Sequence, residues 1–291
     1  MEGFLAQSIN GLALGSIYGL LVTGFNLLLL VGGIIPFVYP FVVVICMYVT
    51  WAVMGATGES LLLAIPATIL SATVLTVLME PLFRPLAKRK AEAQTFVMAV
   101  GLSMILTHIM ALHLNHGFPV SFSASLVGRE AAIKLGLVVV SRGQLLTFLG
   151  TIAAVVAFMY LLYRTMPGRA FRSMAQNPLV ARLLGIPINR SAVASYGVAG
   201  VLGGVTAVFL AMALGTAYPI LGENLALKTL AVALFAGMGN LRGGLICGLI
   251  LGMAEGLATG YIAGLWSNAV AFGMIMVVVI LRPKGLFGVK F

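Results

Sequence analysis

Long apolar runs, separated by short polar segments, dominate the sequence. A helix rises about 1.5 Å per residue and the hydrocarbon core of a bilayer is about 30 Å thick, so one helical crossing takes about 20 apolar residues. Nine runs are candidates, at residues 9–31, 36–56, 61–80, 95–114, 144–163, 191–214, 225–238, 244–262 and 265–281. The seventh is too short to cross unless it tilts or breaks, so the pattern predicts about eight or nine spans.

Composition agrees with an integral membrane protein. Of the 291 residues, 61% are hydrophobic and 8% are charged, and the mean hydropathy is +1.13. The runs are long and continuous rather than short and alternating, which favours helices over a barrel. We therefore expect an all-α, polytopic transmembrane bundle in which residues 1–291 form one domain. Residues 31–40 (VGGIIPFVYP) are interpreted as a loop between two spans, and one broken helix is the open alternative.

The basic residues indicate orientation. The net charge is +10, but Lys and Arg concentrate in the segments 81–94, 164–190 and 282–291. The positive-inside rule places these segments in the cytoplasm, which predicts an outside N-terminus and a cytoplasmic C-terminus. The segment 115–142 carries three basic residues and argues against this scheme. Since no Lys or Arg precedes Arg84, the first run lacks the basic start of a signal peptide and is interpreted as a retained span.

Glycine recurs every four residues in two runs. Such small-residue stripes let two helices approach closely in lipid, so both are predicted packing faces. The stripes comprise Gly11, Gly15 and Gly19 in the first run and Gly244, Gly248, Gly252 and Gly256 in the eighth. At 100° per residue Asn26 lies about 20° from Gly15 on the same face. We interpret its amide as an interhelical hydrogen-bonding group, or alternatively as a contact for a transported molecule.

Few ionisable groups lie inside the runs. Glu255, His108 and the pair Glu223 and Lys228 are the candidates. The chain contains no aspartate, which excludes aspartyl dyads and disfavours a proton relay built from acid chains. The three histidines, His108, His113 and His116, do not have the spacing of a helical metal-binding pair, and the two cysteines imply no disulfide or metal framework. No GxxxxGK[ST] phosphate-binding loop occurs.

The segment RTMPGRAFRSMAQNPLVARLLGIP, residues 164–187, contains four arginines and no acidic residue. Asn177 suits a helix N-cap, Pro178 the first helical position, and Gly185 the left-handed residue after the end. These residues predict a helix of about seven residues. One of its sides carries Leu179, Val180, Leu183 and Leu184. It is either a loop lying on anionic lipid or a helix that docks in a groove of a cytoplasmic protein.

A family resemblance favours the docking interpretation. The segment 164–187 resembles the cytoplasmic coupling loop of permeases from ABC importers of the branched-chain amino acid type. The other matching motifs are GLALGSIYGLLVTGFNLLLL (11–30), RPL (84–86), AVGLSMIL (99–106), LKTLAVALFAGMGNLRGGLICGLILGMAEGL (227–257) and RPKGLFG (282–288). The resemblance covers nearly the whole chain.

The resemblance implies a permease subunit of the bacterial inner membrane that is not itself an enzyme. It would import a small solute, a branched-chain amino acid or a related molecule, delivered by a periplasmic binding protein. A homologous second permease, with which it would form a heterodimer, and two cytoplasmic ATPases would complete the transporter. This chain would bind no cofactor, since ATP and Mg²⁺ belong to the ATPases. Membrane lipid, and no nucleic acid, is the remaining expected partner.

By resemblance, the residues 164–190 form the coupling loop. The resemblance assigns contact with the ATPase to seven residues: Arg172, Ala175, Gln176, Asn177, Leu183, Leu184 and Gly185. The glutamate usual in importer coupling loops is absent, and Gln176 lies near its place. A salt bridge to the ATPase at that point is therefore not expected.

The translocation path is predicted from broken segments. Where relatives commonly read Asn-Phe-Ala-His-Gly, this chain reads Pro-Phe-Val-Tyr-Pro at 36–40. Broken or short segments near mid-membrane are where transporters tend to bind substrate, which selects 34–40 and 222–243. The predicted path residues are Asn26, Pro36, Phe37, Tyr39 and Glu255. The alternative function, an ion- or proton-coupled secondary transporter, would require buried acids in several spans and an inverted repeat.

Overall fold

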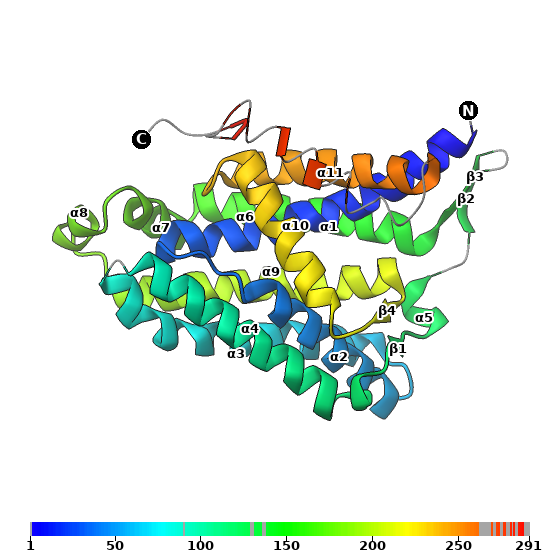
Figure 1. The fold of residues 1–291 in the computed structure, drawn as a ribbon, viewed down its shortest axis with the longest axis horizontal. Coiled ribbons are helices and arrows are strands. Elements are labelled where there is room, and N and C mark those ends of the chain that lie inside the picture. Colours follow the sequence, from blue (N-terminus) through cyan, green and yellow to red (C-terminus); the bar gives the residue numbers. More distant parts are fainter. Residues whose placement is uncertain are drawn as a thin grey trace.

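The computed structural model describes residues 2–261, except 90, 129–130 and 136–137, and scattered positions beyond 261. Seven described helices are long and apolar enough to cross a membrane. They are α1 (Glu2–Gly32), α2 (Tyr39–Ala56), α3 (Leu61–Lys88), α4 (Glu92–His113), α6 (Arg142–Arg164), α9 (Ile188–Leu214) and α11 (Leu241–Tyr261). They lie side by side along the long axis of the molecule (Figure 1).

The two weakest predicted spans have different outcomes. The seventh run corresponds to α10 (Leu221–Ala236), a helix of 16 residues that is followed by Gly237, whose φ is 92°. A helix of that length is shorter than the hydrocarbon core, as its run predicted. The ninth run, 265–281, lies outside the continuously described residues.

Residues 33–38 connect α1 to α2 as a non-helical segment, so the two are separate helices. Gly33 ends α1 with φ 64°, a conformation that glycine adopts without strain. Figure 1 shows this connection running from the end of α1 toward the middle of the bundle before α2 begins. The loop interpretation of 31–40 is therefore correct.

The boundary of α3 corrects the sequence interpretation. The run was predicted to end at 80 and to be followed by a loop at 81–94, but α3 continues to Lys88 through Pro81 and Pro85. A bidentate ion pair between Arg84 and Glu80, one turn apart, supports this last part of the helix. Phe83 is buried there, and its packing offsets part of the backbone hydrogen bonding that the prolines forfeit.

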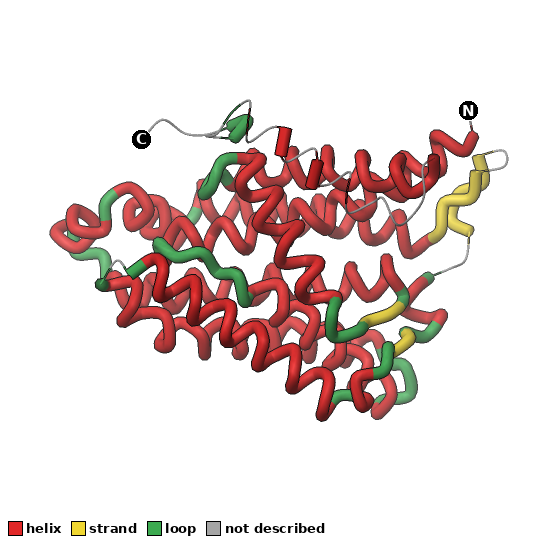
Figure 2. Tube along the Cα trace, viewed as in Figure 1, coloured by secondary structure: helices red, strands yellow, loops and turns green. Residues whose placement is uncertain are grey.

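The two ends of the bundle differ in structure. One end carries two short helices, α7 (Met166–Gln176) and α8 (Pro178–Leu183). The other end carries α5 (Ala124–Val127), the 3₁₀ turn Asn115–Gly117 and two antiparallel strand pairs. The pairs are β1 (Val120–Ser121) with β4 (Thr216–Ala217) and β2 (Ala131–Leu135) with β3 (Val138–Ser141). Figure 2 shows the strands gathered opposite α7 and α8. These short strands were not predicted from the apolar pattern.

The glycine stripes of α1 and α11 face each other. A Cβ added at Gly11 would lie 2.7 Å from the carbonyl oxygen of Gly252, and one at Gly256 would lie 2.7 Å from Gly11 Cα. A Cβ at Gly15 would lie 2.9 Å from the carbonyl oxygen of Gly248. The backbones of α1 and α11 are therefore in direct contact along this interface. Any side chain larger than the hydrogen of glycine would keep the two helices apart.

Candidate coupling segment and interior path

The short helix α8 begins at a side-chain cap. Asn177 has an extended backbone, with φ −157° and ψ 105°, and its Oδ1 accepts hydrogen bonds from the backbone N–H groups of Leu179 and Val180 at 3.0 and 3.2 Å. Pro178 occupies the first helical position, and Gly185 follows the helix with φ 81°. A helix of this length is marginal in water, so the cap is a large part of its local stability.

Four apolar side chains of this segment face solvent. Leu183 and Leu184 are 79% and 74% exposed, Leu179 is 67% exposed and Val180 is 47% exposed. Ala181, on the opposite side, is buried against the bundle. An exposed apolar surface next to arginines suits a protein-binding site, and it also suits contact with anionic lipid.

The helix α7 was missed by sequence analysis. Thr165 accepts a hydrogen bond from the Gly168 N–H at its start, and Gly168, Phe171 and Met174 are buried along one side. Their spacing of three residues was the signal that could have revealed this amphipathic helix. Among the predicted coupling residues, Ala175 is half-buried and Gln176 is exposed at its end.

Arg172 connects α7 to two other helices. Its guanidinium carbon lies 5.0 Å from the centroid of the Tyr163 ring on α6, and the guanidinium carbon of Arg242 on α11 lies 4.6 Å from the same centroid. Both distances suit a cation–π interaction. A displacement of α7 can therefore reach α6 and α11 through one aromatic ring. Tyr163 and Arg242 were not predicted, since only the fold brings them to Arg172.

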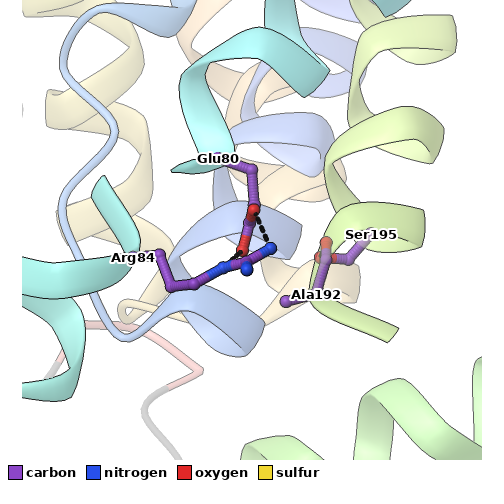
Figure 3. Close-up of polar contacts among 4 residues, drawn as sticks. All are labelled: Glu80, Arg84, Ala192 and Ser195. Atoms are coloured by element: carbon purple, nitrogen blue, oxygen red, sulfur yellow. Dashed lines mark hydrogen bonds and ion pairs between the residues drawn. The ribbon is translucent and has the colours of Figure 1, made fainter. Parts of the chain in front are cut away.

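A cavity of about 550 Å³ lies between the short helices α7 and α8 and the long helices, and we name it the coupling-side cavity after the predicted coupling loop. Residues of α7 and α8, including Ala175, line it together with Gly33 and Tyr196. The ion pair of Glu80 and Arg84 also lines it. In Figure 3 this ion pair faces Ala192 and Ser195 of α9. Glu80, which is 3% exposed, was not recognised as a buried acid because its run was taken to end there.

Tyr39, the first residue of α2, attaches this helix to the bundle by a hydrogen bond and by packing. Its hydroxyl donates a 2.8 Å hydrogen bond to the backbone carbonyl of Ala199 on α9, and its side chain is 1% exposed. A Cβ at Gly24 on α1 would overlap this hydroxyl, and one at Gly203 on α9 would lie 3.1 Å from it. Two glycines therefore make room for one tyrosine between α1 and α9.

The neighbouring predicted path residues occupy packed positions. Pro36 is buried, and the Phe37 ring lies 5.7 Å from that of Phe96 and 6.1 Å from that of Phe41, measured between centroids. Asn26, which is fully buried, donates from Nδ2 to the carbonyl of Asn240 at 3.2 Å and accepts from the Gly239 N–H at 3.4 Å. Its amide therefore holds the turn before α11, so it bonds to a turn rather than to a neighbouring helix.

A buried ion pair joins α10 to α11. Lys228 Nζ lies 2.5 Å from Glu255 Oε1 and 3.4 Å from the Tyr18 hydroxyl on α1. Both charged residues line a cavity of about 280 Å³, which we name the far-side cavity. Leu14 of α1 and Leu214 at the end of α9 also line it. The start of α9 lies near α8 (Figure 1), and Leu214 is at its far end, so this cavity lies in the half of the bundle away from α7 and α8.

Comparisons with known proteins give one consistent family. The family model described as "branched-chain amino acid transport system / permease component" matches residues 7–279. The chain is similar to the high-affinity branched-chain amino acid transport permease BraD of Pseudomonas aeruginosa, at 26% identity over 98% of this chain and 96% of BraD. It is similar to LivH of Escherichia coli K12 at 27% identity, with the same coverage.

A solved structure shows the same architecture at lower sequence similarity. A chain of PsaBC from Streptococcus pneumoniae, determined in complex with a Fab, superposes with a TM-score of 0.53 at 13% identity. The match covers 97% of this chain and 92% of that chain. At this identity the likeness concerns the fold alone.

Proposed function

The chain belongs to the branched-chain amino acid transport permease family of ABC importers, and from this premise we propose that it moves a branched-chain amino acid or a related small molecule into the cytoplasm. As a permease component it is not itself the ATPase. The observation that carries the mechanism is the exposed apolar surface of α8 beside arginines at one end of the bundle. An ion-coupled secondary carrier would have no use for such a surface.

Permeases of this class work with ATPases, a second permease and a binding protein. We place this chain in the bacterial inner membrane, with α7 and α8 in the cytoplasm and the N-terminus in the periplasm. That orientation puts the arginines of 164–190 inside. The second permease is proposed to be a homologous chain, which makes the permease pair a heterodimer. The binding protein is proposed to deliver solute to the end that carries the strands.

Coupling is proposed to be mechanical. Two ATPase subunits dock on the transporter, and Leu183 and Leu184 enter a groove of one of them. Closure of the ATPases around ATP then displaces α8 and α7, and the aromatic ring of Tyr163 passes the displacement to α6 and α11. A transition between inward-open and outward-open states follows, because the ATPases bind the two states with different affinity.

The proposed path follows α1 and α9 through the protomer. The far-side cavity is lined by Tyr18 and Leu210, and the coupling-side cavity by Leu30 and Ala192. Tyr39 contacts the same two helices between these levels, at Gly24 and at Gly203. Tyr39 thus acts as a barrier between the two cavities, and withdrawal of the connector at 33–38 would join them. Glu255 lies on the far-side part of this path.

Reconstitution tests the proposed function. Proteoliposomes that hold this chain with its partner permease and ATPases are expected to accumulate radiolabelled leucine, isoleucine or valine only with ATP inside and loaded binding protein outside. Vesicles that hold this chain alone are expected to accumulate none. Uphill uptake by the chain alone, driven by an ion gradient, would establish the secondary-carrier alternative instead.

Shortening Tyr39 tests the path. The Tyr39→Ala variant removes the ring that fills the space between Gly24 and Gly203, so passive leucine efflux from ATP-free proteoliposomes is expected to rise about tenfold or more, the equivalent of lowering the barrier by about 1.4 kcal/mol. Tyr39→Phe is the matched control, because it keeps the ring and loses only the hydrogen bond to Ala199. Equal, low efflux from wild type and Tyr39→Ala would remove Tyr39 from the path.

A further inference from the structure

The ion pair of Lys228 and Glu255 lies inside the bundle, where charges are costly. Lys228 is 8% exposed and Glu255 is 7% exposed. Bringing both groups out of water costs several kcal/mol per ion in general, and their attraction recovers this only with good geometry. A packing role alone is served as well by apolar residues of the same size. Ionisable groups within a membrane-spanning bundle indicate function when they border a cavity, as these two do.

We propose that Lys228 and Glu255 form a binding subsite for a small zwitterion with an apolar side chain, and that the solute rests there during passage. This inference rests on the proposed function and adds a site to it. The Lys228 ammonium donates to the carboxylate of the solute, and the Glu255 carboxylate accepts from its ammonium group. The solute inserts between the two groups, so each charge exchanges one partner for another and no net charge enters the bundle.

The far-side cavity suits such a solute in size and chemistry. Its volume of about 280 Å³ accommodates one aliphatic amino acid. Besides the charged pair, the lining consists of five leucines from three helices, Leu14, Leu210, Leu214, Leu221 and Leu225, and of four polar residues, Tyr18, Thr216, Tyr218 and Asn224. The Tyr18 hydroxyl, 3.4 Å from Lys228 Nζ, adds a polar group beside the charges. Two charged groups of opposite sign match the two charged ends of an amino acid, and the five leucines supply apolar surface for its side chain.

The position of the cavity gives the subsite its place in the transport cycle. It borders α1 and α9 beyond Tyr39, on the side away from α7 and α8. A solute released by the binding protein would reach Lys228 and Glu255 before the Tyr39 barrier. The subsite would therefore be occupied in the outward-open state and emptied when the barrier withdraws.

A cysteine at the rim of the cavity can report occupancy. Leu214 lines the cavity and is 38% exposed. Ile220, which is not a lining residue, lies in the turn before α10 and is 60% exposed. The native thiols of Cys46 and Cys247 are buried, so their labelling background is low. The experiment compares maleimide labelling of Leu214→Cys and Ile220→Cys in membrane vesicles that contain the complete transporter.

L-leucine is the probe, and it is expected to slow labelling of Leu214→Cys but not of Ile220→Cys. In a Leu214→Cys background, the double substitution Lys228→Gln and Glu255→Gln removes both charges. Glutamine has the length of glutamate and is one atom shorter than lysine. The double substitution is expected to raise the leucine concentration for half-protection about tenfold or more, since hydrogen bonds to charged groups are lost. Labelling of Ile220→Cys with the same double substitution controls for folding, because an intact bundle leaves its rate unchanged.

Three further compounds complete the design. 4-Methylpentanoate and 3-methylbutylamine each carry one end of the zwitterion and are expected to protect weakly. O-Phosphoethanolamine represents a zwitterionic lipid headgroup, and protection by it in place of leucine would assign the site to lipid and overturn the proposal. Leucine protection that survives the double substitution would also overturn it. A third outcome separates the two proposals. If the Leu214→Cys transporter takes up leucine but leucine does not slow its maleimide labelling, the subsite is refuted and the proposed import function stands.

Discussion

Replacing Leu183 and Leu184 together by aspartate is expected to abolish ATP-driven uptake while the chain still inserts in the membrane. Both side chains are more than 70% exposed in the free subunit and would be buried against an ATPase. Each loses about 1.5–3 kcal/mol of apolar burial, and each new carboxylate adds a desolvation cost. The affinity between permease and ATPase should therefore fall at least about a hundredfold. Uptake and co-purification of the ATPase measure the effect.

The matched control for this variant replaces the same two residues by methionine. Methionine keeps the apolar character and the approximate volume, so uptake is expected to remain close to that of the wild type. Membrane yield should be equal for both variants, because neither position contributes to the buried core. Normal uptake by the aspartate variant would remove α8 from the coupling mechanism.

Replacing Gly252 by alanine is expected to destabilise the bundle by about 1–3 kcal/mol or more, since a methyl group is forced into a tightly packed interface. A Cβ at this position would overlap the backbone of Gly15, and backbone on either side cannot move aside as a flexible side chain would. A lower unfolding temperature and a lower yield of folded protein in detergent are the expected observations.

Gly101 provides the control for this substitution. It lies within α4, and a Cβ added there meets no atom of the described residues within 4 Å. Alanine at this position has the better helix propensity and is expected to leave stability unchanged or raise it by about 0.5–1 kcal/mol. Equal stability of Gly252→Ala and Gly101→Ala would show that the α1–α11 interface is looser than its geometry indicates.

Much of this structure could be predicted from signals that act over a few neighbouring residues. The cap at Asn177 and the left-handed Gly185 predicted α8 because both act within a few residues of themselves. The stripes of glycine in α1 and α11 predicted close helix packing because a period of four keeps one helix face small. Apolar run length predicted the spans, and it also indicated that the short run of α10 differs from the others.

Relations over long sequence distances could not be predicted in the same way. Lys228 and Glu255 were noticed separately, but their pairing depends on the turn at 237–240 that folds α11 back on α10. The stacking of Arg172 and Arg242 on one tyrosine likewise depends on three helices. The end of α3 was misplaced because its apolar run stops at 80 and basic residues follow, whereas here a local ion pair and packing continue the helix.

The pairing of α1 with α11 has a consequence for biogenesis. During synthesis α1 emerges long before α11. The glycine face of α1 therefore has no packing partner while the helices between them are inserted. That face must meanwhile be covered by lipid or by the insertion machinery. Contacts between such distant segments form late and slowly. The α1–α11 interface should accordingly be among the last helix contacts of the bundle to form.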